Sequence, residues 1–286
     1  MNSVVEGGLP VGFDPEKLLA IAAQVLDGVT DKFLAGLGAP SAVTKGPGDF
    51  ATELDLELER LVSGELSQRT GIAVHGEEYG GPDLSTGTAW VVDPIDGTYN
   101  YSAGLPLAGM LVALVHDGQP VLGLTWLPMS GLNYQGFVGG GLVCNGEPVA
   151  PMPDISLSEA MIAFGAFNLA SRGRYPGAFR VTLLGELSRR TARLRLFGST
   201  GYDLALTAGG LLGGSVTFGH HAWDNAGGAA LVLAAGGRIS DIEGRPWSVT
   251  SPSILAAGPA AHEELLDLIG QLGDPGAFEP PEEKYR

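Results

Sequence analysis

Two aspartates, Asp93 and Asp96, lie three positions apart in the run WVVDPIDGTYNY (residues 90–101), directly after an apolar stretch. Carboxylates that lose hydration without gaining a partner are costly, so either water or a cation must reach this pair. A helix that begins after Gly97 would add free backbone N–H groups, which favour a phosphate. An ordinary Asp-Pro and Asp-Gly surface turn explains the same residues. The run alone does not decide between these two interpretations.

Three more acidic positions could serve the same chemistry. Glu77, followed by Glu78, comes after the apolar segment IAVHG, where a solvated acidic loop is the ordinary explanation. Asp224 precedes a segment of small apolar residues and is predicted to be the N-cap of a helix. Asp55 lies three residues after Thr52 and fits a capping box. The alternative is that these carboxylates hold a cation and that Asp55 accepts a proton from an attacking water.

Several other chemistries do not fit the sequence. Phosphatases of the haloacid-dehalogenase type have one residue between their two aspartates, whereas Pro94 and Ile95 intervene here. The chain has no Gly-x-x-x-x-Gly-Lys-Ser/Thr loop and no His-Glu-x-x-His segment. His220 and His221 are adjacent, so their side chains are expected to point apart. Oxygen ligands select hard cations, and Mg²⁺ suits phosphate chemistry.

The overall composition narrows the class of protein. The 286 residues include 32 acidic and 16 basic ones, for a net charge of −16, which disfavours nucleic acid and anionic membranes as partners. Cys144 is the only cysteine; this excludes an internal disulfide, and a buried thiol is expected. The N-terminal residues lack a signal-peptide pattern, and the longest apolar run, Leu105–Val115, is too short to span a bilayer. A soluble cytoplasmic protein is expected.

The elements that must position these residues form an α+β first half. Apolar periodicity predicts helices over Asp14–Val29 and Thr52–Arg69, with a loop between them. Strands are predicted at residues 72–78, 89–97, 107–115, 121–126 and 132–138. The last three strands read as an antiparallel meander, and Asn145-Gly146 predicts one more hairpin.

From residue 151 onward the pattern changes to alternating strands and helices, as in an α/β unit. Strands are predicted near Met161–Phe164, Leu194–Phe197, Val216–Phe218, Gly237–Ser240 and Ile254–Ala257. Helices are predicted near Ala178–Arg190, Tyr202–Gly209, Asn225–Ala235 and Ala260–Leu272. We therefore predict two domains, residues 1–150 and 151–286, with a disordered tail over residues 273–286.

Taken together, the segments DFATELD, HGEE, DPIDGTYN and WDNAGGAALVLAAGG occur in an order that resembles the inositol monophosphatase family, over about Asp14 to Ile269. The segments LPLAGMLVALVHDGQPVLGLTWLP and GSTGYDLAL look like the middle strands and the substrate-side loop of that family. The resemblance implies an α/β (α+β) fold, a layered α-β-α-β-α sandwich. It also implies hydrolysis of phosphomonoesters with two or three Mg²⁺ ions, frequent homodimers and inhibition by lithium.

The resemblance implies a role for each matching residue. Glu77 corresponds to a ligand of the first metal and is counted with the catalytic residues. Asp93 corresponds to a carboxylate that bridges two metals, and the backbone carbonyl of Ile95 to a further ligand. Asp96 and Asp224 correspond to ligands of the second metal that also contact substrate. Asp55 and Thr98 correspond to the pair that orients and deprotonates the attacking water. Gly97 and Thr98 correspond to residues that contact the phosphate. The alcohol portion of the substrate would be contacted by Gly198, Ser199 and Thr200.

One departure concerns the substrate. Many family members that use inositol phosphate have an acidic residue seven positions before the aspartate of the Trp-Asp pair, and here that position is Thr217. Inositol 1-phosphate is the expected substrate, with histidinol phosphate, fructose 1,6-bisphosphate and 3′-phosphoadenosine 5′-phosphate as alternatives. A regulatory or interaction module that keeps the fold without the activity is the alternative from another class. The intact set of acidic positions favours the enzyme.

Overall fold

The structure is a computed structural model that describes residues 13–38, 43–46, 49–165 and 168–278. Residues 1–12, most of the N-terminal segment in which no signal peptide is predicted, lie outside the described residues. The same holds for residues 279–286 of the predicted tail. Among the helices that are described, none combines the length and the apolar character that crossing a bilayer requires.

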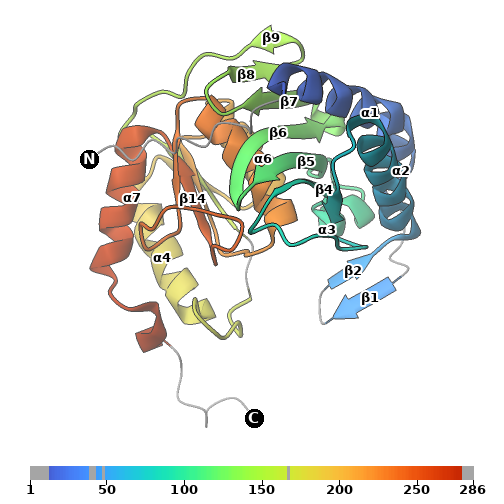
Figure 1. Ribbon diagram of the computed structural model, residues 1–286. Coiled ribbons are helices and arrows are strands. Elements are labelled where there is room, and N and C mark those ends of the chain that lie inside the picture. The colour runs from blue at the N-terminus through green and yellow to red at the C-terminus, as the bar shows by residue number, and fades with distance from the viewer. Residues whose placement is uncertain (1–12, 39–42, 47–48, 166–167, 279–286) are drawn as a thin grey trace.

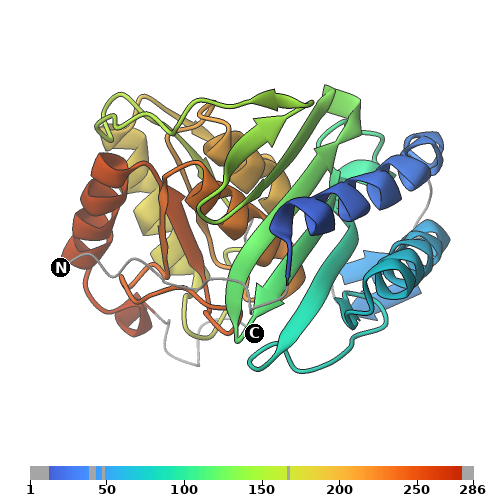
Figure 2. The same ribbon diagram turned by 45° about the horizontal axis from the view of Figure 1, so that its top comes forward.

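The chain folds into five layers that alternate between helices and sheets, as the family resemblance implies (Figure 1). Helices α1 (Pro15–Ala35) and α2 (Glu53–Thr70) cover the outer face of one sheet, which Figure 2 shows from a second direction. Helices α5 (Thr200–Ala208) and α6 (Ala222–Ala234) lie between the two sheets. Helices α4 (Gly177–Arg190) and α7 (Pro259–Gln271) cover the far face of the second sheet.

The first sheet has seven strands in the order of the sequence, β3 to β9, and contains the predicted meander. Only β3 and β4 run parallel; all later neighbours in this sheet are antiparallel. Asn145 and Gly146 form the turn of the last hairpin, as predicted. The strands are β3 (Val74–Gly76), β4 (Thr88–Asp96), β5 (Gly109–His116), β6 (Gln119–Leu127), β7 (Leu132–Phe137), β8 (Gly141–Cys144) and β9 (Glu147–Pro148).

The second sheet has five strands in the order β11-β10-β12-β14-β13. Its strands are β10 (Met161–Phe164), β11 (Arg193–Arg195), β12 (Gly214–Thr217), β13 (Arg238–Ser240) and β14 (Ile254–Ala257). Strand β10 runs parallel to β11 and β12, whereas β14 is antiparallel to β12 and β13. The change from one sheet to the other falls between Pro148 and Met161, and the division into two domains stays a prediction.

Alternation along the strands assigns their side chains to separate cores. Trp90 and Val92 of β4 pack beneath α1 and α2, whereas Val91 faces the central layer. Leu255 of β14 faces α4 and α7, and Ala256 faces the central layer. Successive side chains of a strand point to opposite faces, so each sheet supplies two cores at once. The central core therefore combines residues from both halves of the chain.

Helix α6 lies very close to the first sheet because glycines form the contact. A Cβ atom added to Gly123 of β6 would lie 2.2 Å from the carbonyl oxygen of Gly227. A Cβ atom added to Gly228 would lie 2.3 Å from Cβ of Leu204 in α5. The small residues noted in the sequence thus set the distance between the sheet and the helix that carries Asp224.

Four local predictions need correction. The first helix continues through Gly28 to Ala35, because Val29 and Phe33 are buried and Phe33 packs against Tyr101. The segment predicted as a loop contains a two-stranded hairpin, β1 (Val43–Gly46) and β2 (Asp49–Ala51), because the two strands pair with each other. In the predicted tail, Pro275–Phe278 forms a 3₁₀ turn because Phe278 packs on Phe179. Cys144 is only partly buried, since β8 lies near the edge of its sheet.

The close approach of α6 leads to a stability prediction. Replacing Gly123 with Ala should lower the free energy of unfolding by roughly 1–3 kcal/mol, because the added methyl group collides with backbone. Urea unfolding followed by circular dichroism measures the change. The matched control is Gly64→Ala in α2, where an added Cβ meets nothing within 4 Å; it should stabilise the protein by up to about 1 kcal/mol. A Gly123→Ala variant as stable as the wild type would contradict this account of the packing.

Candidate metal and phosphate site

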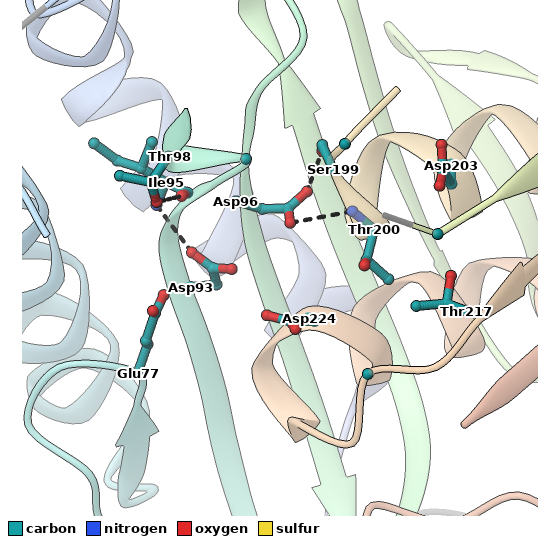
Figure 3. A pocket seen from close by; sticks show the side chains of 14 residues that line it. Glu77, Asp93, Ile95, Asp96, Thr98, Ser199, Thr200, Asp203, Thr217 and Asp224 are labelled. Atoms are coloured by element: carbon teal, nitrogen blue, oxygen red, sulfur yellow. Dashed lines mark hydrogen bonds between the residues drawn. The ribbon is translucent and has the colours of Figure 1, made fainter. Parts of the chain in front are cut away.

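A cavity of about 280 Å³ lies where the first sheet, α5 and α6 meet, and five acidic residues contribute to its wall (Figure 3). Asp93, Asp96 and Asp224 each place a carboxylate oxygen so that all three oxygens lie within 4.8 Å of one another. Asp93 and Asp96 are buried, with 2% and 6% of their surfaces exposed, and Asp224 is partly buried. Three carboxylates at this spacing offer the oxygen ligands that hard divalent cations prefer.

A bulge in β4 brings Asp93 and Asp96 to the same cavity. Residues three apart on a regular strand point to opposite faces. Here Asp93 pairs with Leu111 and Asp96 pairs with Gly109, so β4 has one more residue than β5 between these pairs. Such an extra residue bends the strand and redirects a side chain. Pro94 lies within the bulge, and the Ile95 N–H donates to Asp93 Oδ1 at 3.0 Å.

Asp96 is held from the opposite side by the start of α5. The backbone N–H groups of Thr200 and Gly201 donate to its two oxygens at 3.2 and 2.9 Å, and the Ser199 hydroxyl also donates to it. The positive end of a helix dipole suits a carboxylate there. A Cβ atom on Gly201 would lie 2.9 Å from Asp96 Oδ2, which explains the small residue. Ser199, Thr200 and Gly198 all line the cavity, and their contact with substrate stays a prediction.

Glu77 lines the cavity from the end of β3, and a second glutamate fixes the backbone that follows it. The carboxylate of Glu59, in α2, accepts the N–H groups of Glu78 and Tyr79 at 2.8 and 3.0 Å. Glu59 is 1% exposed, and a Cβ atom on Gly76 would lie 1.8 Å from its Oε1. Glycine at position 76 therefore leaves the space that Glu59 occupies.

Asp55 does form the predicted capping box of α2. Its Oδ2 accepts the Thr52 N–H at 2.8 Å and also the Thr52 hydroxyl. Asp55 is not among the residues that line the cavity, whereas Thr98 is. The Thr98 hydroxyl donates to the Ile95 carbonyl at 3.0 Å, at the start of α3 (Thr98–Ser102). Of the two residues predicted to act on water, only Thr98 lines the cavity, and the roles of both stay predictions.

Burial and mutual repulsion dominate the electrostatics of the site. Burial raises the pKa of Asp93 well above its ordinary value, and the charges of Glu77, Asp96, Asp224 and Asp55 raise it further. Burial also raises the pKa of Asp96 to about 6, although the hydrogen bonds from Ser199, Gly201 and Thr200 oppose the shift. The pKa of Asp55 is raised too, first by burial. A bound cation would favour the ionised carboxylates and so oppose these shifts, and the donor set therefore fits a divalent metal.

Two expectations about the segment before α6 are wrong. The N-cap of α6 is His221, and Asp224 lies in the first turn with its side chain directed at the cavity (Figure 3). Ala222 and Trp223 are already helical, so the helix begins earlier than its apolar pattern suggests. The rings of His220 and His221 lie 4.2 Å apart rather than pointing apart, since these residues precede the helix in a loop without strand alternation.

Sequence reasoning missed two carboxylates. Glu59 holds the backbone that follows Glu77, and Asp203 lines the cavity. Burial, and then the charge of Asp96, raises the pKa of Asp203 well above its usual value. A signal for Glu59 did exist, because it follows Asp55 by four positions and so shares its face of the helix. The signal for Asp203 was a single charge within the otherwise apolar segment GYDLALTA.

The raised pKa values lead to a pH-dependent prediction for the metal-free protein. A carboxyl group whose pKa is higher in the folded state stabilises that state only while protonated, so stability falls as pH rises from about 4 through about 6, the pKa of Asp96. Asp93→Asn should relieve the repulsion and raise Tm by roughly 2–5 °C at pH 7.5. Thermal unfolding with a chelator measures this, and saturating Mg²⁺ should remove or reverse the gain. A metal-free wild type that is equally stable at pH 4.5 and 7.5 would contradict the electrostatic account.

The contacts of Glu59 lead to another prediction. Glu59→Gln should weaken Mg²⁺ binding by roughly 10-fold or more, because groups that orient metal ligands have effects of this size. Calorimetric titration of the metal-free protein with Mg²⁺ measures the affinity. The control is Glu57→Gln in the same helix, an exposed residue paired with Lys32 at 2.6 Å, which should leave the affinity unchanged. Loss of thermal stability with unchanged affinity would mean that Glu59 only supports the fold.

Comparison with known proteins places this geometry in a family. The sequence profile of the inositol monophosphatase family matches residues 14–273. The inositol-1-monophosphatase ImpA of Mycolicibacterium smegmatis is 50% identical over 265 residues, which cover 92% of this chain and 96% of that protein. The fructose-1,6-bisphosphatase/inositol-1-monophosphatase of Thermotoga maritima is 27% identical over 78% of this chain and 84% of its own length.

Solved structures agree with the fold. The IMPase of Thermotoga maritima superposes with a TM-score of 0.80 at 25% identity, over 90% of this chain and 98% of that one. The profile match extends over nearly all the described residues and includes both sheets and every acidic side chain of the cavity. The chain belongs to the inositol monophosphatase family and is, by that membership, a phosphoric monoester hydrolase.

Proposed function

We propose that this protein hydrolyses inositol 1-phosphate to inositol and inorganic phosphate with Mg²⁺ as its metal. The observation that carries the proposal is the convergence of Asp93, Asp96 and Asp224, whose carboxylate oxygens lie within 4.8 Å of one another in a cavity also lined by Glu77. The 50% identity with a protein named inositol-1-monophosphatase supports this substrate over the alternatives.

Glu77, Asp93, Asp96, Asp224 and the Ile95 carbonyl are the groups that would hold two or three Mg²⁺ ions. When bound, Mg²⁺ lowers the pKa of water and stabilises negative charge on the phosphate and the leaving oxygen. The residues supply only oxygen donors, and their mutual repulsion without a counter-charge supports occupation by divalent cations.

Thr98 and Asp55 are proposed to orient the attacking water, and Asp55 to accept its proton. Thr98 lines the cavity and begins α3, so its hydroxyl can exchange the Ile95 carbonyl for a water. Burial raises the pKa of Asp55 toward the range in which a general base is effective. Both capping bonds from Thr52 go to Oδ2 of Asp55, and we assign the proton transfer to its other oxygen.

The substrate is proposed to lie across the cavity, between the ends of β4 and α5. Backbone N–H groups of Gly97 and Thr98 would contact the phosphate, while Gly198, Ser199 and Thr200 would contact the alcohol portion. Asp96 and Asp224 would touch both metal and substrate. Asp96 keeps its place because Ser199 and the first N–H groups of α5 hold its carboxylate.

Three further properties belong to the same proposal. As the family resemblance implies, we propose that the protein acts as a homodimer, that lithium inhibits it and that it works in the cytoplasm. A sedimentation measurement tests the first, and assays with added Li⁺ test the second. The cytoplasmic assignment is tested by locating the protein in fractionated cells.

Phosphate release from four substrates tests the function: inositol 1-phosphate, histidinol phosphate, fructose 1,6-bisphosphate and 3′-phosphoadenosine 5′-phosphate. Release should require Mg²⁺, stop with a chelator and be fastest for inositol 1-phosphate. Asp93→Asn and Asp224→Asn should each lower kcat by roughly 100-fold or more, since ligand loss removes charge stabilisation in the transition state.

The control for these two variants is Asp267→Asn, an exposed residue of α7 on the opposite side of the second sheet. It should leave kcat unchanged. No release from any of the four substrates with Mg²⁺ present would favour a module that binds without turnover. Faster turnover of another substrate would keep the mechanism and replace the substrate.

A further inference from the structure

One side-chain amide joins two segments that meet beside the cavity. The side-chain nitrogen of Asn100, in α3, donates to the carbonyl oxygens of Leu107 at 2.8 Å and of Phe197 at 2.7 Å. Both partners are acceptors, so the chemistry decides which end of the amide faces them. Leu107 precedes β5 of the first sheet, whereas Phe197 follows β11 of the second. Asn100 therefore connects segments that belong to the two different sheets.

The segment that Asn100 holds also supports Asp96. It comprises residues 197–201, which we call the clamped segment. The Ser199 hydroxyl and two backbone N–H groups of this segment donate to the Asp96 carboxylate (Figure 3). Asp96 and Asn100 lie four positions apart in the turn from β4 to α3. This turn thus holds the clamped segment at both ends, with an acceptor at one end and a donor at the other.

Glycines allow the turn and the clamped segment to touch. A Cβ atom on Gly97 would lie 2.9 Å from Cβ of Ser199 and 2.9 Å from the carbonyl oxygen of Leu107. A Cβ atom on Gly198 would lie 3.4 Å from the side-chain nitrogen of Asn100. Gly198 also has a φ of 78°, which other residues adopt at a cost. Because neither glycine has a side chain to act as a spacer, the hydrogen bonds of Asn100 fix the distance between the two segments.

Asn100 acts on the site through its neighbours. Its side chain is half-buried and is not among the residues that line the cavity. An amide nitrogen has two hydrogens, and each of them has a carbonyl partner here. Removing the amide would leave both carbonyl groups short of a partner, which is costly away from water. The two segments would then separate or turn to find water.

The two joined segments have different proposed roles in binding substrate. Gly97 and Thr98, in the turn, are the proposed contacts of the phosphate, and both line the cavity. Gly198, Ser199 and Thr200, in the clamped segment, line it too and are the proposed contacts of the alcohol portion. A rigid phosphate ester can engage both sets only if their separation is fixed. Asn100 supplies a direct hydrogen-bonded link between them.

We propose that Asn100 is a positioning residue that keeps the phosphate contacts and the alcohol contacts at a fixed separation. This inference rests on the proposed function, because it assumes that a phosphate ester binds in the cavity. The contacts concerned exist in the bound substrate as well as in the transition state. Their loss should therefore weaken substrate binding more than turnover, which appears as a raised KM with little change in kcat.

The test is Asn100→Asp in the Mg²⁺-loaded enzyme, with inositol 1-phosphate as substrate. An ionised aspartate has the shape of asparagine but only accepts hydrogen bonds, so it repels both carbonyl groups. KM should rise by roughly 10-fold or more, while kcat should stay within about threefold. Asn100→Ser keeps one donor and should give a smaller rise in KM. It also decides the question if Asn100→Asp does not fold.

The matched control is Asn145→Asp. Asn145 also links two segments through its side-chain amide, which accepts the Asn133 N–H at 2.9 Å and donates to the Gly131 carbonyl at 2.7 Å. It is exposed and does not line the cavity, so KM should keep its wild-type value. Thermal unfolding of each variant measures its stability. A variant that is only destabilised has a smaller active fraction, which lowers the apparent kcat and leaves KM unchanged.

A double-mutant cycle shows whether Asn100 acts through the clamped segment. Ser199→Ala removes the hydroxyl that donates to Asp96 at the other end of that segment. If both side chains hold the same segment, releasing it once leaves less for the second substitution to change. The double variant with Asn100→Asp should then raise KM by less than the product of the two single effects.

The outcomes separate this inference from the proposed function. If the wild type releases phosphate while folded Asn100→Asp and Asn100→Ser keep its KM, or lose only kcat, the positioning role is wrong and the proposed function stands. Single effects on KM that multiply in the double variant would also overturn the role, since the two side chains would then act independently. If the wild type releases no phosphate from any of the four substrates with Mg²⁺, the proposed function fails and the positioning role fails with it.

Discussion

The repulsion among carboxylates that share one poorly hydrated cavity is the interaction on which the rest of the structure depends. Asp93 is buried, and Glu77, Asp96, Asp224 and Asp55 are all close enough to raise its pKa. Hydrogen bonds such as those to Asp96 compensate this repulsion only in part. The surrounding framework must therefore be stable enough to hold these carboxylates away from bulk water, in an arrangement that can bind a cation.

The framework meets this demand by fixing each carboxylate from a different element. Asp96 accepts hydrogen bonds from the start of α5, Asp224 projects from the first turn of α6, and Glu77 follows β3. Because Gly123 and Gly227 have no side chains, α6 can pack closely against the first sheet. Since both sheets contribute to the central core, a shift of one layer would move the acidic residues relative to one another. The packing of the layers therefore determines the geometry of the site.

The sequence by itself determined what depends on local pattern and residue type. Apolar periodicity placed α2 and β14 within a residue of their observed ends, and the ordered acidic motifs identified Glu77, Asp93, Asp96 and Asp224 as residues of one site. Contacts between distant segments decided the rest. The bulge opposite Leu111 turns Asp96 to the side of Asp93, and the β1–β2 pairing makes strands of a segment rich in Gly and Pro. Glu59 and Asp203 gain their significance only from neighbours far along the chain, because burial and unpaired oxygen atoms are properties of the packed molecule and not of any short segment.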